Sequence, residues 1–267
     1  MITENNDPVA PPPRPAPARH APRVSIVRIE DLSHSYGSHR ALDQVRLHLS
    51  TGVTALLGPN GAGKSTLLGL LSSSLRVQRG TIELAGLDPV RDARRYRRAI
   101  GFLPQRFSVP GHLTCAEFLE LTAWWREVAA RDRRELVRGA LRSVALEQRG
   151  SSTVRALSGG MQRRLGIAQA LVNAPDVLLL DEPTVGLDPR QRAGLREVIT
   201  ELGRTRTVLV STHLTEDVAA LAHHIAILDR GRVVFRGAPA ELTTTPAPTA
   251  ADLDRAYERL VGDGEPW

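Results

Sequence analysis

The 267-residue sequence contains one cysteine, one lysine and few aromatic residues, which make up 4% of the chain. The single cysteine, Cys115, excludes a disulfide framework within one chain and fits a reducing compartment. No run of about 18 apolar residues is present, so no segment is predicted to span a bilayer. The N-terminus lacks the order of basic, apolar and small residues that marks a secretory signal. Any role at a membrane is therefore expected to need a partner.

Lysine is almost absent although the chain is basic. Of the 35 lysine and arginine residues only Lys64 is lysine, and the formal net charge is +6. A basic surface can favour nucleic acid or anionic lipid. The arginines are nevertheless scattered and interleaved with acidic residues, so we interpret them mainly as a solvated surface. We expect no nucleic-acid partner.

Composition divides the chain into three parts. Residues 1–23 are rich in proline, alanine and arginine, cannot bury much apolar area, and are predicted to form a disordered tail. Residues 24–242 form the expected main domain. Residues 243–267 return to proline, alanine and threonine before a short predicted helix, and form a C-terminal extension.

The main domain predicts an α/β fold. Apolar runs at 53–57, 177–181 and 207–212 are typical of buried strands, and helical patterns separate them. This alternation indicates a mostly parallel sheet covered by helices. Earlier strands with short turns, beginning with residues 24–29, indicate a smaller antiparallel sheet beside it. Residues 225–237 are predicted to form a hairpin.

Residues 110–149 carry apolar residues at three- and four-residue spacing with charged residues opposite, which predicts helices. We expect Cys115 to be a helical core residue. Trp124 and Trp125 lie in this segment and leave two interpretations open. They pack in the core with a partly exposed ring, or they form a docking surface for another protein.

A glycine-rich segment follows the first buried run and precedes a predicted helix. Its sequence, GPNGAGKST, fits the phosphate-loop pattern G-x-x-x-x-G-K-[ST]. Backbone N–H groups of such a loop turn toward phosphate oxygens. Lys64 is expected to reach the terminal phosphates, and the Ser65 hydroxyl is expected to bind Mg²⁺. The alternative is a chance glycine-rich turn. The predicted nucleotide-binding residues here are Gly58, Pro59, Asn60, Gly61, Ala62, Gly63, Lys64, Ser65 and Thr66.

Two carboxylates end the buried run VLLLDEP at 177–183. They are expected at the carboxyl edge of the sheet, where ligands bind in folds of this type. Asp181 is predicted to hold Mg²⁺, and Glu182 to act as the general base on the attacking water. The alternative interpretation is a solvated Asp-Glu turn.

The segment LSGGMQ, at 157–162, narrows the choice among phosphate-loop proteins. It resembles the LSGGQ signature of ABC ATPases, with Met161 in place of the usual glutamine. The resemblance implies that Ser158, Gly159 and Gly160 bind the γ-phosphate held by a second subunit. Ser158 is also expected to cap a helix. The resemblance covers residues 24–242 and implies a P-loop NTPase core, an antiparallel β subdomain and an inserted helical subdomain at about 108–165.

Further residues match the family in chain order. The resemblance implies that Tyr36 stacks on adenine, Gln105 senses Mg²⁺ and the attacking water, and Asp188 lies on a loop at the dimer interface. It implies that His213 contacts the γ-phosphate and orients Glu182. Alone, Tyr36 would more often be a packing residue and His213 a structural one.

By this resemblance the chain is expected to bind ATP and Mg²⁺ and to hydrolyse ATP as a peripheral subunit on the cytoplasmic face of the cell membrane. Its expected partners are an integral membrane permease and a second ATPase subunit in a head-to-tail dimer, expected to be a homodimer. The segments LPQ–P–LT–E, from residue 103 to 117, and EPTVGLDP favour export of a small molecule, drug, lipid or ion. The alternative is a soluble ABC ATPase acting on ribosomes or DNA. A binding-only subunit is a third interpretation, which intact Glu182 and His213 disfavour.

Overall fold

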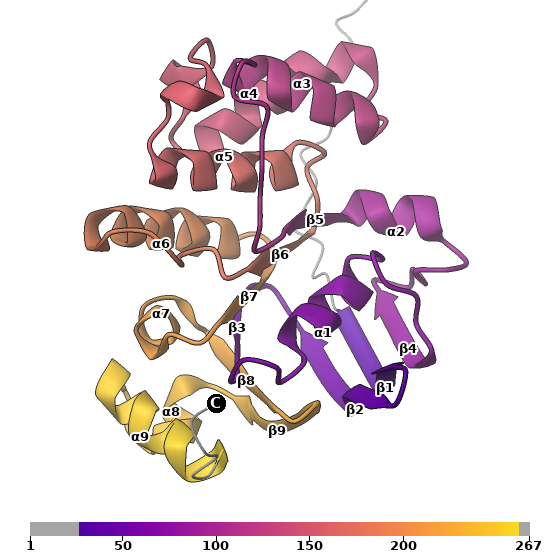
Figure 1. The fold of residues 1–267 in the computed structure, drawn as a ribbon, viewed down its shortest axis with the longest axis vertical. Coiled ribbons are helices and arrows are strands. Elements are labelled where there is room, and N and C mark those ends of the chain that lie inside the picture. The colour runs from indigo at the N-terminus through magenta and orange to yellow at the C-terminus, as the bar shows by residue number, and fades with distance from the viewer. Residues whose placement is uncertain (1–26, 262–267) are drawn as a thin grey trace, which may run out of the picture.

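The computed structural model describes residues 27–261 (Figure 1). The predicted tail at 1–23 and the first three residues of the strand predicted at 24–29 lie outside the described residues. The last six residues of the C-terminal extension, 262–267, also lie outside them.

The main sheet has six strands in the order β5-β6-β7-β3-β8-β9. Its strands pair in parallel up to β8, and β8 then pairs antiparallel with β9 as the predicted hairpin. The mostly parallel sheet is therefore confirmed. Its strands are β3 (Gly52–Leu57), β5 (Ile100–Leu103), β6 (Val177–Asp181), β7 (Thr207–Thr212), β8 (His224–Asp229) and β9 (Arg232–Gly237).

The smaller antiparallel sheet has the order β2-β1-β4, which confirms the second predicted sheet. It consists of β1 (Val27–Tyr36), β2 (His39–Leu49) and β4 (Arg79–Leu84). Buried positions of β1 alternate with more exposed ones over much of the strand, and its apolar residues Val27, Ile29 and Leu32 are all buried, as expected for a strand with one face on a core. Between this sheet and the main sheet lies a core that also takes in apolar residues of α1 (Lys64–Leu71).

Three helices, α3 (Cys115–Trp125), α4 (Ala130–Ser143) and α5 (Gly159–Leu171), gather at one end of the molecule (Figure 1). Thr114 and Glu117 form a capping box that starts α3, and Cys115 is buried there as predicted. The remaining helices are α2 (Ala93–Ala99), α6 (Pro189–Gly203), α7 (Thr215–Leu221), α8 (Pro239–Thr243) and α9 (Ala250–Val261). Two short 3₁₀ turns, Glu147–Arg149 and Val154–Ala156, lie between α4 and α5.

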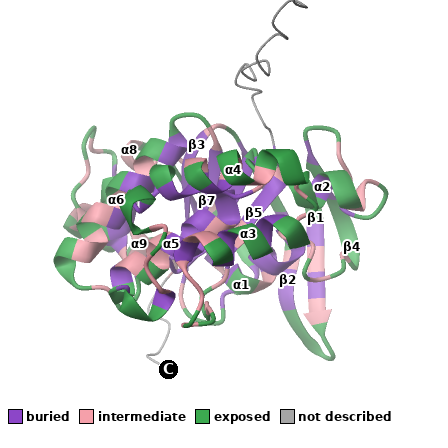
Figure 2. Ribbon diagram, turned by 90° about the horizontal axis from the view of Figure 1, so that it is seen from above, coloured by how far each residue is buried: buried purple, intermediate pink, exposed green. Residues whose placement is uncertain are grey.

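The central strands are buried on both faces, and Figure 2 shows them between the helices. Every residue of β3, β6 and β7 is buried, which explains why their sequences are continuous apolar runs rather than alternating ones. One face meets the core that joins α3–α6. Farther along the same face, Leu253 of α9 packs with Ala55 and Leu57 of β3, and the opposite face meets the core that takes in α1 and the smaller sheet. The C-terminal helix thereby covers the strand that leads into the phosphate loop.

The two tryptophans at the end of α3 lie on the surface. Trp124 is 55% exposed and Trp125 is 75% exposed. The core-packing interpretation is therefore wrong for both rings. None of the helices within residues 27–261 is long and apolar enough to cross a membrane.

Candidate functional site

The glycine-rich loop joins the end of β3 to the start of α1, as the sequence predicts. Two of its glycines are required by close packing. A Cβ at Gly58 would overlap the carbonyl oxygen of Leu228 in β8, and Gly63 combines φ of 106° with a position against the carbonyl of Ala41 in β2. The loop is thus held between β8 and β2, with its backbone free of side chains at the points of contact.

Lys64 begins α1 and is buried, with 7% of its surface exposed. Its Nζ donates hydrogen bonds to the carbonyl oxygens of Gly58, at 2.6 Å, and Pro59, at 2.9 Å. Burial lowers the pKa of the Lys64 ammonium, and the negative charges of Glu182 and Asp181 oppose this shift. The single lysine of the chain therefore lies inside the loop, near both predicted acidic residues.

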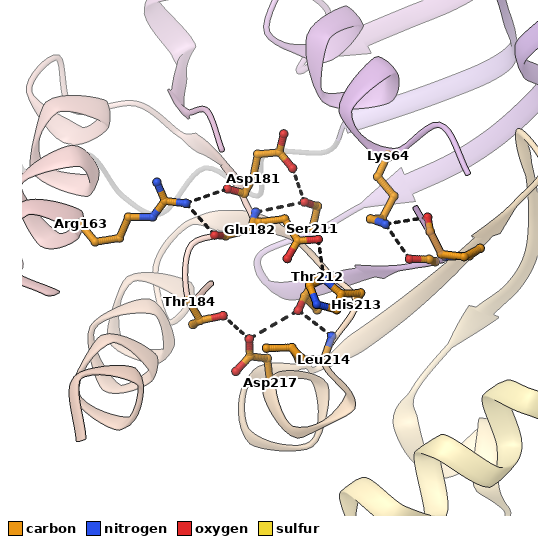
Figure 3. Close-up of polar contacts among 12 residues, drawn as sticks. Lys64, Arg163, Asp181, Glu182, Thr184, Ser211, Thr212, His213, Leu214 and Asp217 are labelled. Atoms are coloured by element: carbon orange, nitrogen blue, oxygen red, sulfur yellow. Dashed lines mark hydrogen bonds and ion pairs between the residues drawn. The ribbon is translucent and has the colours of Figure 1, made fainter. Parts of the chain in front are cut away.

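The two acidic residues lie at the carboxyl edge of β6, each fixed from β7. The Ser211 hydroxyl donates to Oδ1 of Asp181, and the Glu182 N–H donates to the carbonyl oxygen of Ser211 at 3.2 Å (Figure 3). Glu182 is 5% exposed and has φ of 47°, the left-handed region that few non-glycine residues adopt. Its Oε1 lies 3.0 Å from Nδ1 of His213. Its Oε2 is buried without a hydrogen-bond partner among the described residues.

A pocket of about 270 Å³ brings most of the predicted residues together. Tyr36, which is 51% exposed, lies on one wall, and the phosphate loop and the two acidic residues lie on others. His213 joins this group through Glu182. The lining residues are Tyr36, His39, Ala41, Asn60, Gly61, Gly63, Lys64, Ser65, Thr66, Gln105, Asp181 and Glu182.

The predicted residues Ser158, Gly159, Gly160 and Asp188 do not line this pocket. Ser158 caps α5, as predicted, by accepting from the N–H of Met161 at 3.3 Å. Asp188 caps α6 in the same way through Gln191, at 2.8 Å. The two helix starts lie together, because a Cβ at Gly160 would be 2.9 Å from the Gln191 side chain. Ser158 and Asp188 are exposed, so each helix N-terminus is accessible from outside the subunit.

Sequence reasoning missed three polar residues that hold the site. The Arg163 guanidinium donates to backbone oxygens of the turn after β6, and the Ser211 hydroxyl donates to Asp181. Asp217 of α7 is buried, forms an ion pair with Arg196, and accepts from Thr184, a residue of the same turn. The double arginine after LSGGMQ was a visible signal. For Ser211 and Asp217 the sequence carried none, because their partners lie about 20 to 30 positions away.

The arrangement is suited to a bound anion with a polyphosphate chain. Backbone N–H groups, a helix start and an ammonium group line the pocket together with two carboxylates. An exposed aromatic ring lies at the same pocket. These are the elements needed to bind a nucleotide and to deprotonate a water molecule beside its phosphates.

Comparisons with known proteins agree with this geometry. The family model described as ABC transporter matches residues 42–185. The chain is 41% identical over 220 residues to the "Daunorubicin resistance ATP-binding protein DrrA3" of Streptomyces coeruleorubidus, covering 82% of this chain and 70% of the relative. It is 37% identical over 221 residues to the "Nod factor export ATP-binding protein I" of Ralstonia nicotianae, covering 82% of this chain and 69% of the relative.

A solved structure extends the comparison. It is a dimeric ATP-binding cassette in a post-hydrolysis state with ADP and Pi, 27% identical to this chain, with a TM-score of 0.68 over 79% of this chain and 98% of that one. The fold, with its mixed sheet, antiparallel sheet and helices, is that of such cassettes. The chain therefore belongs to the ABC transporter family, as one of its ATP-binding and ATP-hydrolysing subunits.

Proposed function

We propose that this chain powers export of a small molecule, drug, lipid or ion through a separate membrane subunit. The observation that carries the motor role is the pocket that joins the phosphate loop to Gln105, Asp181 and Glu182. The direction of transport is supported by the relatives, of which one is named for daunorubicin resistance and another for Nod factor export. Neither is named for ribosomes or DNA.

Tyr36 and the phosphate loop are proposed to bind the nucleotide. The half-exposed Tyr36 ring offers a face for adenine. N–H groups of residues 60–66, in the loop and the first turn of α1, are placed to bind phosphate oxygens. In this structure Lys64 donates to two loop carbonyls. When nucleotide binds, we expect its ammonium group to turn to the terminal phosphates, because their negative charge stabilises a buried cation.

The donor atoms in the pocket fit Mg²⁺. Asp181 supplies a carboxylate that Ser211 orients, Ser65 supplies a hydroxyl, and Gln105 lies on the same pocket. Mg²⁺ prefers oxygen ligands and is usually held by one or two carboxylates together with substrate phosphates. When bound, it would neutralise charge on the phosphate oxygens.

Glu182 is proposed to be the general base, and His213 to orient it. The free oxygen of Glu182, Oε2, is buried and without a partner among residues 27–261. It is therefore able to accept a proton from a water molecule. The contact between His213 and Oε1 holds the other oxygen in place.

Two copies of the chain are proposed to close head to tail over two nucleotides. Ser158–Gly160 and Asp188 form adjacent, accessible helix starts outside the pocket of their own subunit. A helix start of this kind binds anions, so we expect it to meet the phosphates held by the second subunit. The dimeric cassette solved with ADP and Pi supports this assembly.

The membrane subunit is proposed to dock an acidic segment on the surface around the exposed tryptophans. Trp125 lies in a hollow of about 310 Å³ between α2 and the end of α3. Arg94 and Arg98 both form ion pairs with Glu127. Arg97 and Arg126, by contrast, have no acidic partner among residues 27–261. An exposed ring beside unpaired guanidinium groups favours a partner with acidic and apolar side chains. The hollow is lined by Arg94, Arg97, Arg98, Trp125, Arg126 and Glu127.

Co-purification tests the transporter assignment. The tagged chain, extracted gently from its native host, is expected to bring down a polytopic membrane protein in stoichiometric amount, which would also place the chain at the membrane. Recovery of ribosomes or DNA factors without a membrane protein would contradict it.

The same experiment tests the docking surface. Arg97→Glu and Trp125→Ala are expected to reduce recovery of the membrane protein. Arg79→Glu, which changes an exposed arginine on β4, is the control. Full recovery with both docking variants would exclude this surface.

A further inference from the structure

Arg163 lies on the first turns of α5 and directs its guanidinium at the turn after β6 (Figure 3). Its Nη2 donates to the carbonyl oxygen of Glu182 at 2.6 Å, and its Nε donates to that of Pro183 at 3.0 Å. A longer contact of 3.4 Å joins Nη2 to the carbonyl of Asp181. One side chain therefore binds the backbone of three consecutive residues.

The same guanidinium reaches a second functional segment. Its Nη1 donates to the carbonyl oxygen of Gln105 at 2.9 Å, across 58 residues of sequence. Gln105 and Glu182 both line the nucleotide pocket. The Arg163 fork therefore holds both residues through their backbones and leaves their side chains directed elsewhere.

The backbone of Glu182 needs such support. A left-handed conformation costs a non-glycine residue about 1 kcal/mol or more and persists where surrounding contacts enforce it. Arg163 donates to the carbonyl of Glu182 itself and to that of Pro183, with a longer contact to that of Asp181, and Ser211 accepts from the Glu182 N–H. Because Arg163 and Ser211 hold the peptide groups, the Glu182 carboxylate is left facing the pocket and His213.

Arginine suits this role and lysine does not. The guanidinium offers five N–H donors in a rigid fork, whereas an ammonium group is a single point with three rotatable donors. Burial lowers the pKa of the Arg163 guanidinium, while the charges of Asp181 and Glu182 oppose that shift. The cost of desolvating this group is offset by the carbonyls of the Gln105 and Glu182 segments.

We propose that Arg163 is a positioning residue for ATP hydrolysis, which sets Glu182 and Gln105 together through their backbone carbonyls. Arg163 is not among the residues that line the pocket, and it acts through Gln105 and Glu182, which are. The proposal rests on the proposed role of Glu182 as the base. It does not depend on export or on the identity of the membrane subunit.

Steady-state ATP hydrolysis by the full-length chain with Mg²⁺ tests this. Arg163→Met is expected to lower kcat at least tenfold while the KM for ATP stays within about threefold. Arg163→Lys keeps the charge and is expected to restore only part of the rate, and added guanidinium is expected to raise the rate of Arg163→Ala. Arg164→Met is the matched control, because Arg164 is the next residue of α5 and has no hydrogen bond or ion pair among the described residues.

A combined variant separates positioning from a merely structural role. In the Glu182→Gln background, Arg163→Met is expected to change the residual rate less than twofold, because the group that it positions is already lost. Full kcat in Arg163→Met would overturn the proposal. So would a multiplicative loss in the combined variant, or equal damage to KM and kcat. If Arg163→Met does not fold, Arg163→Lys decides, since an unchanged kcat there would show that the fork is dispensable. A wild-type chain that hydrolyses no ATP would instead refute the proposed function.

Discussion

Replacing Glu182 with glutamine removes one proton acceptor and keeps the shape of the side chain. The retained amide oxygen can still meet Nδ1 of His213, which now lies 3.0 Å from Oε1. The backbone contacts of residue 182 with Arg163 and Ser211 do not involve the side chain and should persist. The variant therefore tests the chemistry of the carboxylate with little change in its surroundings.

The structure sets opposite expectations for rate and stability. Loss of a positioned general base lowers kcat about 10²- to 10⁴-fold, or about 2.7–5.4 kcal/mol of activation free energy at about 1.36 kcal/mol per factor of ten. Glu182 is 5% exposed and its Oε2 has no partner within residues 27–261. Removing this buried charge relieves a desolvation cost, so the free energy of unfolding should not fall.

Phosphate release at saturating ATP measures kcat, and calorimetric titration measures ATP affinity, which we expect to stay within about threefold. With ATP and Mg²⁺ the variant should elute as a dimer in gel filtration, because its closed state is not opened by hydrolysis. Glu197→Gln, on the exposed face of α6, is the matched control. A kcat within tenfold of the wild-type value would refute the assignment of Glu182 as the base. A large drop in stability would refute the argument about its buried oxygen.

Four further outcomes are expected. Lys64→Ala should weaken ATP binding at least tenfold in calorimetric titration, because a charged donor to phosphate is lost; unchanged affinity would remove Lys64 from the site. Asp217→Asn should lower the free energy of unfolding by about 3–5 kcal/mol in urea, since Arg196 loses a buried partner, and a change below about 1 kcal/mol would contradict this. Gly139→Ala should stabilise α4 by about 0.5–1 kcal/mol, because nothing lies within 4 Å of the added Cβ; a lower Tm would show that the helix is not as described. Deletion of residues 1–22 should leave ATP hydrolysis intact, and loss of folding would contradict the predicted tail.

The sheets and the loop could be predicted because their signals are local. The phosphate loop lies within nine consecutive residues, and β6 is an apolar run that ends at the two acids. The Ser158 cap was equally readable, since it depends on the next three positions. In each case the physical cause lies within one turn or one strand of the residue that carries it.

Other features depend on contacts between distant segments. Arg163 meets Gln105 across 58 positions, and Asp217 meets Thr184 across 33, so neither pairing leaves a periodic pattern. The left-handed backbone of Glu182 is enforced by β7 and α5 rather than by its own sequence. The exposure of Trp124 and Trp125 follows from how α3 packs on its neighbours. Helical spacing alone does not reveal that both of these adjacent rings are exposed.

Lys64 gives the molecule a single side-chain site for chemical labelling of amines. It carries the only side-chain amine of the sequence, and its Nζ is engaged by the carbonyls of Gly58 and Pro59. Amine-directed reagents therefore have one side-chain target, located where nucleotide is proposed to bind. The mass added at this residue would report occupancy of the site directly, without a fluorescent analogue. Lysine-directed cross-linkers and surface immobilisation, by contrast, have no exposed lysine to use on this chain.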